Sequence, residues 1–169
     1  TYGGAGIGVE ENATLIITKK STGSLTATGG GYGAAGIGGR ATVPLNGDIK
    51  SYKTGTIEIQ GGNIHAVGGD CWFKGSATRL GGAGIGTGMY GIGGTVRILG
   101  GTVKAEGGRD TGAGIGGGDN GAVDLIQIGG KNGEAPEVEA SSWNVKYGAA
   151  IGSGRNAQFD LKLSCGTIN

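Results

Sequence analysis

The side chains best suited to contacting a ligand are aromatic, and they gather in one kind of segment. Both tryptophans, Trp72 and Trp143, precede a recurring Ile-Gly pair, in segments that also carry polar residues. An aromatic face beside hydrogen-bonding groups suits a sugar, because a pyranose has an apolar C–H face and a rim of hydroxyls. The expected glycan-binding residues are Trp72, Phe73, Trp143 and Tyr147 as stacking surfaces, with Tyr32, Arg109 and Asp110 at the rim. In the alternative, Trp72, Phe73 and Trp143 fold back and cover the end of an apolar core.

Acid–base catalysis has less support. His65 is the only histidine, and it alternates with Ile64 and Ala66, which predicts an outward, solvated side chain. A catalytic histidine needs a positioned carboxylate and a nucleophile, and no such set is evident along the chain. Sugar cleavage would also need carboxylates or basic groups clustered on one face. We therefore expect no enzymatic activity and predict no catalytic residues.

Calcium is the one metal for which the sequence offers candidate ligands. The segment from Asp119 and Asn120 to Asp124 supplies hard oxygen ligands near glycines and resembles the calcium-binding Gly-Asp turns of β-roll repeats. The nonapeptide spacing of such repeats is not met here, and an Asx turn is the alternative that we favour. We predict no metal site and no cofactor.

The elements that would position these residues are repeats. The string Gly-Ala-Gly-Ile-Gly and its close variants recur with intervals of 30, 48, 30 and 36 residues between their isoleucines. A recurring minimum of 30 residues with additions is typical of a solenoid with loop insertions. The anchoring isoleucines are Ile7, Ile37, Ile85, Ile115 and Ile151.

Two further segments in each unit have apolar residues at every second position, as in 56–60 and 63–67. A period of two bounded by Gly-Gly predicts strands. Three strands of about five residues per unit predict an all-β fold, a single-stranded right-handed parallel β-helix of about five three-strand coils. We expect this solenoid to form one domain over residues 1–169, with the anchoring isoleucines in one inward ladder and alanines beside them.

Glycine accounts for 44 of the 169 residues, against roughly 7% in ordinary proteins. The chain has only 2 prolines and lacks a strict Gly-X-Y period, which excludes collagen. Its 36% of apolar residues argue against simple disorder. Long helices are disfavoured because each interior glycine costs about 0.8–1.0 kcal/mol relative to alanine. The glycines that flank each isoleucine predict either close approach of a neighbouring backbone or a flat, side-chain-free platform for a partner.

Additions to the minimal unit are expected to lie on one edge of the solenoid and to carry function. They are residues 40–55, 70–80, 131–134 and 141–146. Cys71 lies in one of these additions and Cys165 in the last unit, roughly 14 Å apart at the spacing of stacked strands. Because bridged Cα atoms lie within about 7 Å of each other, free thiols or a bridge between chains are the simpler expectations.

The net charge and the hydropathy of the chain limit the classes of partner that we expect it to bind. With 14 basic and 13 acidic residues, the net charge of +1 does not favour nucleic acid. No apolar run approaches the ~18 residues of a membrane span, and no leader begins at Thr1. The chain lacks a starting Met, so we expect a segment excised from a larger protein. The composition suits a secreted or cell-surface bacterial module.

The Gly-Ala-Gly-Ile-Gly strings, joined to Gly-Gly-Thr/Asn-Val/Ile-X-Ala-X-Gly-Gly, resemble Gly-rich repeats in large secreted proteins of gut Firmicutes. They are also similar in style to pectate-lyase-like carbohydrate-binding β-helices, although the calcium-binding acidic clusters of that group are not matched. The resemblance implies a cell-surface or secreted context and contact with a polysaccharide or host glycan. It leads us to expect a non-catalytic glycan-binding or adhesion module. The alternatives are a structural stalk that binds a protein partner or stacks on itself, and a fragment of a polysaccharide-degrading enzyme.

Overall fold

The computed structural model describes residues 2–42, 49–72, 77, 79–130, 135–143, 147–157 and 161–163. Over these residues the chain is all-β, with short strands and no helix. Accordingly, no helix of the described part of the chain is long and apolar enough to cross a membrane. The described ranges contain eighteen strands, distributed over three parallel sheets and two small antiparallel pairs.

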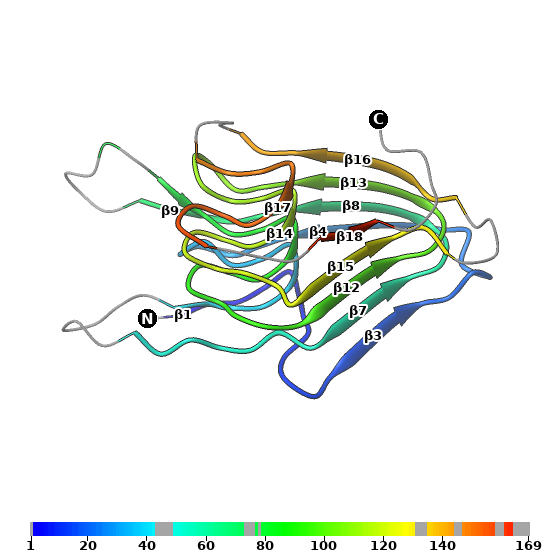
Figure 1. Cartoon of the computed structure of the whole chain (residues 1–169), viewed down its shortest axis with the longest axis horizontal. Helices are drawn as coiled ribbons and strands as arrows, with labels where there is room; N and C mark the ends of the chain where they lie inside the picture. The colour runs from blue at the N-terminus through cyan, green and yellow to red at the C-terminus, as the bar shows by residue number, and fades with distance from the viewer. Residues whose placement is uncertain are drawn as a thin grey trace.

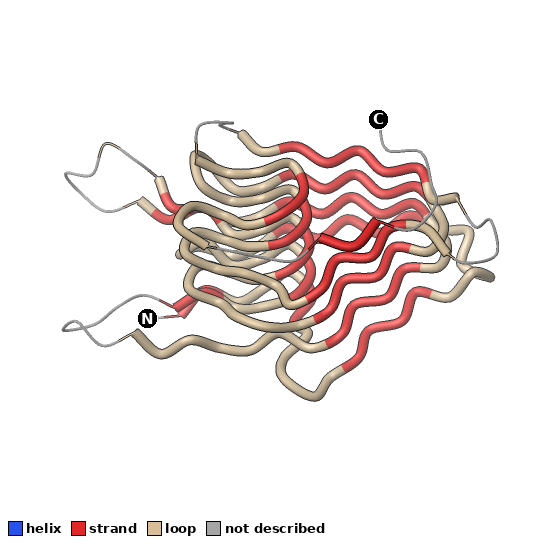
Figure 2. Tube along the Cα trace, in the orientation of Figure 1, coloured by secondary structure: helices blue, strands red, loops and turns tan. Residues whose placement is uncertain are grey.

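The three parallel sheets make up the body of a β-solenoid, as the repeats predict (Figures 1 and 2). The Ile-Gly sheet contains β2 (Ile7–Gly8), β5 (Ile37–Gly38), β11 (Ile85–Gly86), β14 (Ile115–Gly116) and β17 (Ile151–Gly152). The second sheet contains β3 (Thr14–Ile17), β7 (Thr56–Ile59), β12 (Thr95–Ile98), β15 (Leu125–Ile128) and β18 (Leu161–Leu163). The third sheet contains β4 (Ser24–Thr28), β8 (Asn63–Val67), β13 (Thr102–Glu106) and β16 (Glu137–Ser141).

The register of the strands follows the sequence repeat. The anchoring isoleucines form one ladder, in which Ile85 pairs with Ile37 on one side and Ile115 on the other. The ladder continues to Ile7 and Ile151 at its two ends. The predicted inward ladder is therefore confirmed.

The core lies between the three sheets and is built from alternate strand residues. Ile57 and Ile59 of β7 are fully buried, whereas Thr56 and Glu58, which alternate with them, are partly exposed. The same alternation in β12 buries Val96 and Ile98. Each fully buried aliphatic side chain of this kind contributes about 1.5–3 kcal/mol relative to its exposed state, so the ladders supply most of the driving force for stacking.

The Ile-Gly strands are shorter than the sequence predicts, two residues instead of about five. Gly86 follows Ile85 with φ 136°, which ends the extended conformation. The chain then closes a tight loop, in which the Ala83 N–H donates to the Thr87 carbonyl at 3.0 Å. A Cβ on Gly86 would overlap the Gly116 carbonyl oxygen of the neighbouring strand, so no other residue fits.

The glycine before each of the first four anchoring isoleucines lies against backbone, and Ala150 takes this position before Ile151. A Cβ on Gly36 would come within 2.7 Å of the Val67 amide nitrogen, and one on Gly84 within 2.8 Å of that of Glu106. The end of each third-sheet strand thus packs directly on the main chain that precedes the Ile-Gly strand of the same unit, as Val67 of β8 does on Gly36 before β5. Of the two expectations for the flanking glycines, the structure supports close approach of a backbone for those that precede the isoleucines, whereas Gly8 after Ile7 has no neighbouring atom within 4 Å of an added Cβ.

Two of the additions build antiparallel pairs beside the solenoid. β6 (Ala41–Thr42) pairs with β1 (Tyr2–Gly3), and β9 (Asp70–Cys71) pairs with β10 (Leu80–Gly81). The connections from the third sheet to the Ile-Gly sheet extend on the same side, to the left in Figure 1. A second, small core of Ala34, Ala41 and Met89 fills this lobe.

Candidate functional site

The predicted glycan-binding residues Arg109 and Trp143 meet at the exposed edge that follows the third sheet. The Arg109 guanidinium carbon lies 4.9 Å from the centre of the Trp143 ring, a cation–π contact. Trp143 is 68% exposed, so most of its surface is accessible. This edge, formed by Asp70, Arg109, Asp110 and Trp143, is called the Trp143 edge below.

Register explains why these residues meet. Asp70 follows β8 and Arg109 follows β13 by three residues each, and the ends of these strands, Val67 and Glu106, are paired. The Arg109 backbone N–H donates to Asp70 Oδ1 at 2.6 Å, and Arg109 Nε lies 3.5 Å from Asp70 Oδ2. Asp70 therefore fixes both the backbone and the side chain of Arg109.

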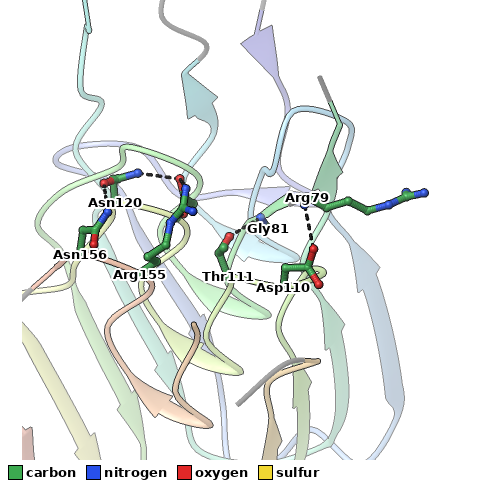
Figure 3. A network of polar contacts seen from close by, with 8 residues as sticks. Arg79, Gly81, Asp110, Thr111, Asn120, Arg155 and Asn156 are labelled. Atoms are coloured by element: carbon green, nitrogen blue, oxygen red, sulfur yellow. Dashed lines mark hydrogen bonds and ion pairs between the residues drawn. The ribbon is translucent and has the colours of Figure 1, made fainter. Parts of the chain in front are cut away.

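The projecting β9–β10 pair is attached to the same edge. The Arg79 N–H donates to Asp110 Oδ2 at 2.8 Å, and the Gly81 N–H donates to Thr111 Oγ1 at 2.8 Å. Figure 3 shows Asp110 and Thr111 turned toward the backbone of this segment. Asp110 has φ 63°, a left-handed conformation that Asp tolerates better than most residues. Asp110 is thus a positioning residue for the hairpin.

The other predicted binding residues are dispersed. Trp72 is 58% exposed just after β9, and Tyr32 is 37% exposed in the turn after β4. Tyr147 lines a separate cavity of about 570 Å³ with Arg155 and Asn156. Phe73 lies outside the described residues. Because Trp72 and Trp143 are exposed and take no part in the core, the alternative in which they cover it is wrong for these two residues.

Sequence reasoning missed two carboxylates. Asp70 was seen only as the boundary of an addition, although its alignment with Arg109 on the next coil was available from the repeat. The second is Glu106, whose Oε1 lies 3.0 Å from His65 Nε2 and 2.9 Å from Lys104 Nζ. His65 therefore has the positioned carboxylate that the sequence did not reveal, in a diagonal pair across neighbouring strands.

The His65–Glu106 pair lies on the outward face of the third sheet. The hydrogen bond from Lys104, together with that from His65, holds the pKa of Glu106 below its ordinary value. A shallow groove of about 280 Å³ adjoins it, with Ser24, Thr26, Asn63, His65, Thr102 and Lys104 among its lining residues. The arrangement can bind polar groups through its hydrogen-bond donors and acceptors.

The candidate calcium residue Asp119 is engaged within the protein. Its side chain is fully buried, Arg155 Nε donates to Oδ1 at 2.9 Å, and Asn120 Nδ2 donates to Oδ2 at 2.6 Å. Within the described ranges, no three His, Cys, Asp or Glu side chains are placed to share a metal ion. The Asp119 carboxylate instead neutralises Arg155 at the turn after β14.

Cys71 is buried beside this charge pair. Desolvation, and then the negative charge of Asp119, raise the pKa of the Cys71 thiol. It forms no disulfide within the described part of the chain, and Cys165 lies outside that part. A buried thiol with a raised pKa is a poor nucleophile at neutral pH.

Comparison with protein families, with curated proteins and with solved structures found no match for this chain.

Proposed function

We propose that this chain is a non-catalytic carbohydrate-binding or adhesion module of a secreted or cell-surface bacterial protein. The observation that carries the proposal is the exposed Trp143 ring with a guanidinium stacked on it and fixed by Asp70. A large aromatic surface held beside donors and acceptors matches the two-sided chemistry of a sugar.

The remaining charges of the Trp143 edge would complement sugar hydroxyls. Arg109 has a half-exposed side chain and five N–H donors, and Asp70 supplies acceptors at its side. Trp72 and Tyr32 add exposed aromatic surface, and Phe73, Tyr147 and Asp110 complete the proposed set. The expected partner is a polysaccharide or a host glycan, with no nucleic acid, membrane or cofactor required.

A glycan array tests this proposal. The wild-type chain should bind at least one glycan class, and Trp143→Ala should weaken that binding about tenfold or more, because aromatic anchors dominate such interfaces. Ile16→Ala is the matched control, since it removes a comparably exposed apolar side chain from the second sheet. Absence of any glycan signal would reject the function, and equal losses in both variants would reject the site.

A structural stalk or protein-binding repeat is the second candidate. Its support is the unbroken register of the Ile-Gly ladder, which suits a spacer built by repetition. Pull-down of a host protein without any glycan signal would favour the stalk over the glycan-binding module.

We also propose that the solenoid is a right-handed helix of five coils, consistent with the general preference for right-handed crossovers.

The third candidate, a fragment of a polysaccharide-degrading enzyme, is favoured only by the His65–Glu106 pair. The proposal that the chain is not an enzyme predicts no new reducing or unsaturated ends after incubation with bound polysaccharide. Turnover that disappears in His65→Ala would replace the binding proposal with a catalytic one.

A further inference from the structure

A polar groove of about 540 Å³ runs along the starts of the second-sheet strands, away from the residues of the Trp143 edge. It crosses the segments that lead into β3, β7, β12 and β15. The groove is lined by Glu11, Asn12, Ala13, Thr14, Lys53, Thr54, Gly55, Thr56, Ile92, Gly93, Gly94, Thr95 and Asp124.

Residues 53–55, at the end of the addition 40–55, supply one wall of this groove. Its returning limb is held by main-chain bonds, from Thr54 N–H to the Ile92 carbonyl and from Ile92 N–H to the Tyr52 carbonyl, both 3.0 Å long. The Gly55 N–H donates to the Val9 carbonyl at 2.9 Å on the other side. The wall is therefore fixed before any ligand arrives, which lowers the entropic cost of binding.

The groove presents a row of hydroxyls at a regular spacing. Thr14, Thr56 and Thr95 occupy the same register position on three neighbouring strands, about 4.8 Å apart. Each hydroxyl can donate one hydrogen bond and accept others. A ligand that repeats its own hydroxyl groups along an extended chain could contact them in succession.

The charged lining residues nearly cancel. Lys53 Nζ lies 3.0 Å from Glu11 Oε1, and Asp124 is the remaining carboxylate. With two carboxylates and one ammonium, the groove disfavours binding of a polyanion. Because Lys53 neutralises Glu11, the groove also attracts a polycation only weakly. Carboxylate and hydroxyl oxygens together are strong acceptors for neutral hydroxyl donors.

One lining residue, Thr54, has a buried hydroxyl that forms no hydrogen bond within the described residues. Thr54 is 4% exposed, and its Oγ1 has no hydrogen-bond partner within the described part of the chain. A buried hydroxyl in this state is uncommon, and an ordered water or ion is one of the accepted explanations. This observation is independent of the threonine row.

From these observations we propose that the groove binds an uncharged, extended oligosaccharide, at a site separate from the Trp143 edge. Because the lining residues that the structure describes include no aromatic ring, hydroxyls and carboxylates, and not stacking, would provide recognition. The site would hold one chain lengthwise, parallel to the axis along which the strands stack.

The test is an NMR titration of the whole chain with cellohexaose, mannohexaose and xylohexaose. At least one should shift the amides of Gly93, Gly94 and Thr95. The double variant Thr56→Val/Thr95→Val should weaken that binding at least about fivefold, because it removes two hydroxyls while keeping the β-branched shape. Thr28→Val on the outward face of the third sheet is the matched control and should have no effect.

Several outcomes would overturn the proposal. They are no groove shifts with any of the three sugars, loss of the groove shifts in Trp143→Ala, and stronger binding of an oligogalacturonate or of a cationic glucosamine oligomer. Groove binding that survives in Trp143→Ala, beside an array signal lost in that variant, would support both sites. Each proposal can therefore fail without the other.

Discussion

Arg155 donates to both carboxylate oxygens of Asp119, whose side chain has no exposed surface. Asp70 and Arg109 form a similar pair at the surface, where solvent screens the charges and the pair contributes little to stability. The same chemistry therefore has two consequences. The buried pair must stay complete, because a lone buried charge is costly, whereas the surface pair mainly orients Arg109 toward Trp143.

Glu106 makes stability depend on pH. Its pKa is lowered in the folded protein, first by the hydrogen bond from Lys104 and then also by His65. A carboxyl with a lowered folded pKa contributes stability above its unfolded value, near 4.5, and loses it as the pH falls through the folded pKa. We expect the free energy of unfolding to decline below that value, and Glu106→Gln to reduce the decline.

The measurement is urea unfolding at several pH values from about 6 to about 3. Glu139→Gln is the control, since Glu139 is 72% exposed and lies 3.9 Å from Lys104. A pH profile that is the same in Glu106→Gln and in the wild-type chain would contradict the assignment.

The Ile-Gly strands depend on a backbone conformation that only glycine adopts easily. Gly86 combines φ 136° with a direct approach to the Gly116 carbonyl, so Gly86→Ala should cost at least ~3 kcal/mol of unfolding free energy. The corresponding Gly8 in β2 has no heavy atom within 4 Å of an added Cβ. Gly8→Ala should therefore change the stability by less than about 1 kcal/mol. Urea unfolding of both variants compares them, and equal losses would refute the explanation.

The elements were predictable to the extent that they follow side-chain alternation. Ile57 and Ile59 identify both the strand and its inward face, and the 30-residue interval places Ile85 beside Ile115. The two-residue length of the Ile-Gly strands was not predictable in this way, because it depends on the φ of Gly86 and not on hydropathy.

The candidate site was predictable only in part. The sequence places Arg109 and Trp143 on one edge, but their contact depends on how the chain turns after β13 and β16. The groove beside the second sheet was not predicted, because the returning limb of addition 40–55 creates it through main-chain bonds. Main-chain hydrogen bonds of this kind leave no pattern of side-chain types in the sequence from which they could be predicted.

At the scale of the whole molecule, stability should vary along the solenoid. Ile85 is fully buried inside the ladder, whereas Ile7 at its end is only partly buried. Ile85→Ala should cost about 2–5 kcal/mol, and Ile7→Ala less than half of the loss measured for Ile85→Ala. Thermal or urea unfolding of the two variants provides the comparison. Similar losses would mean that the chain does not follow the nearest-neighbour energetics of a solenoid.

The bonds that join neighbouring strands of the Ile-Gly, second and third sheets run along the axis of stacking, as the parallel registers require. Tension applied along this axis would load the bonds of one coil at a time, so the coils would peel off in sequence at low force. Tension applied across it would load all the bonds of a strand together in shear. Such a rod would be mechanically anisotropic, and the direction in which a tether pulls would decide how long the module survives under flow.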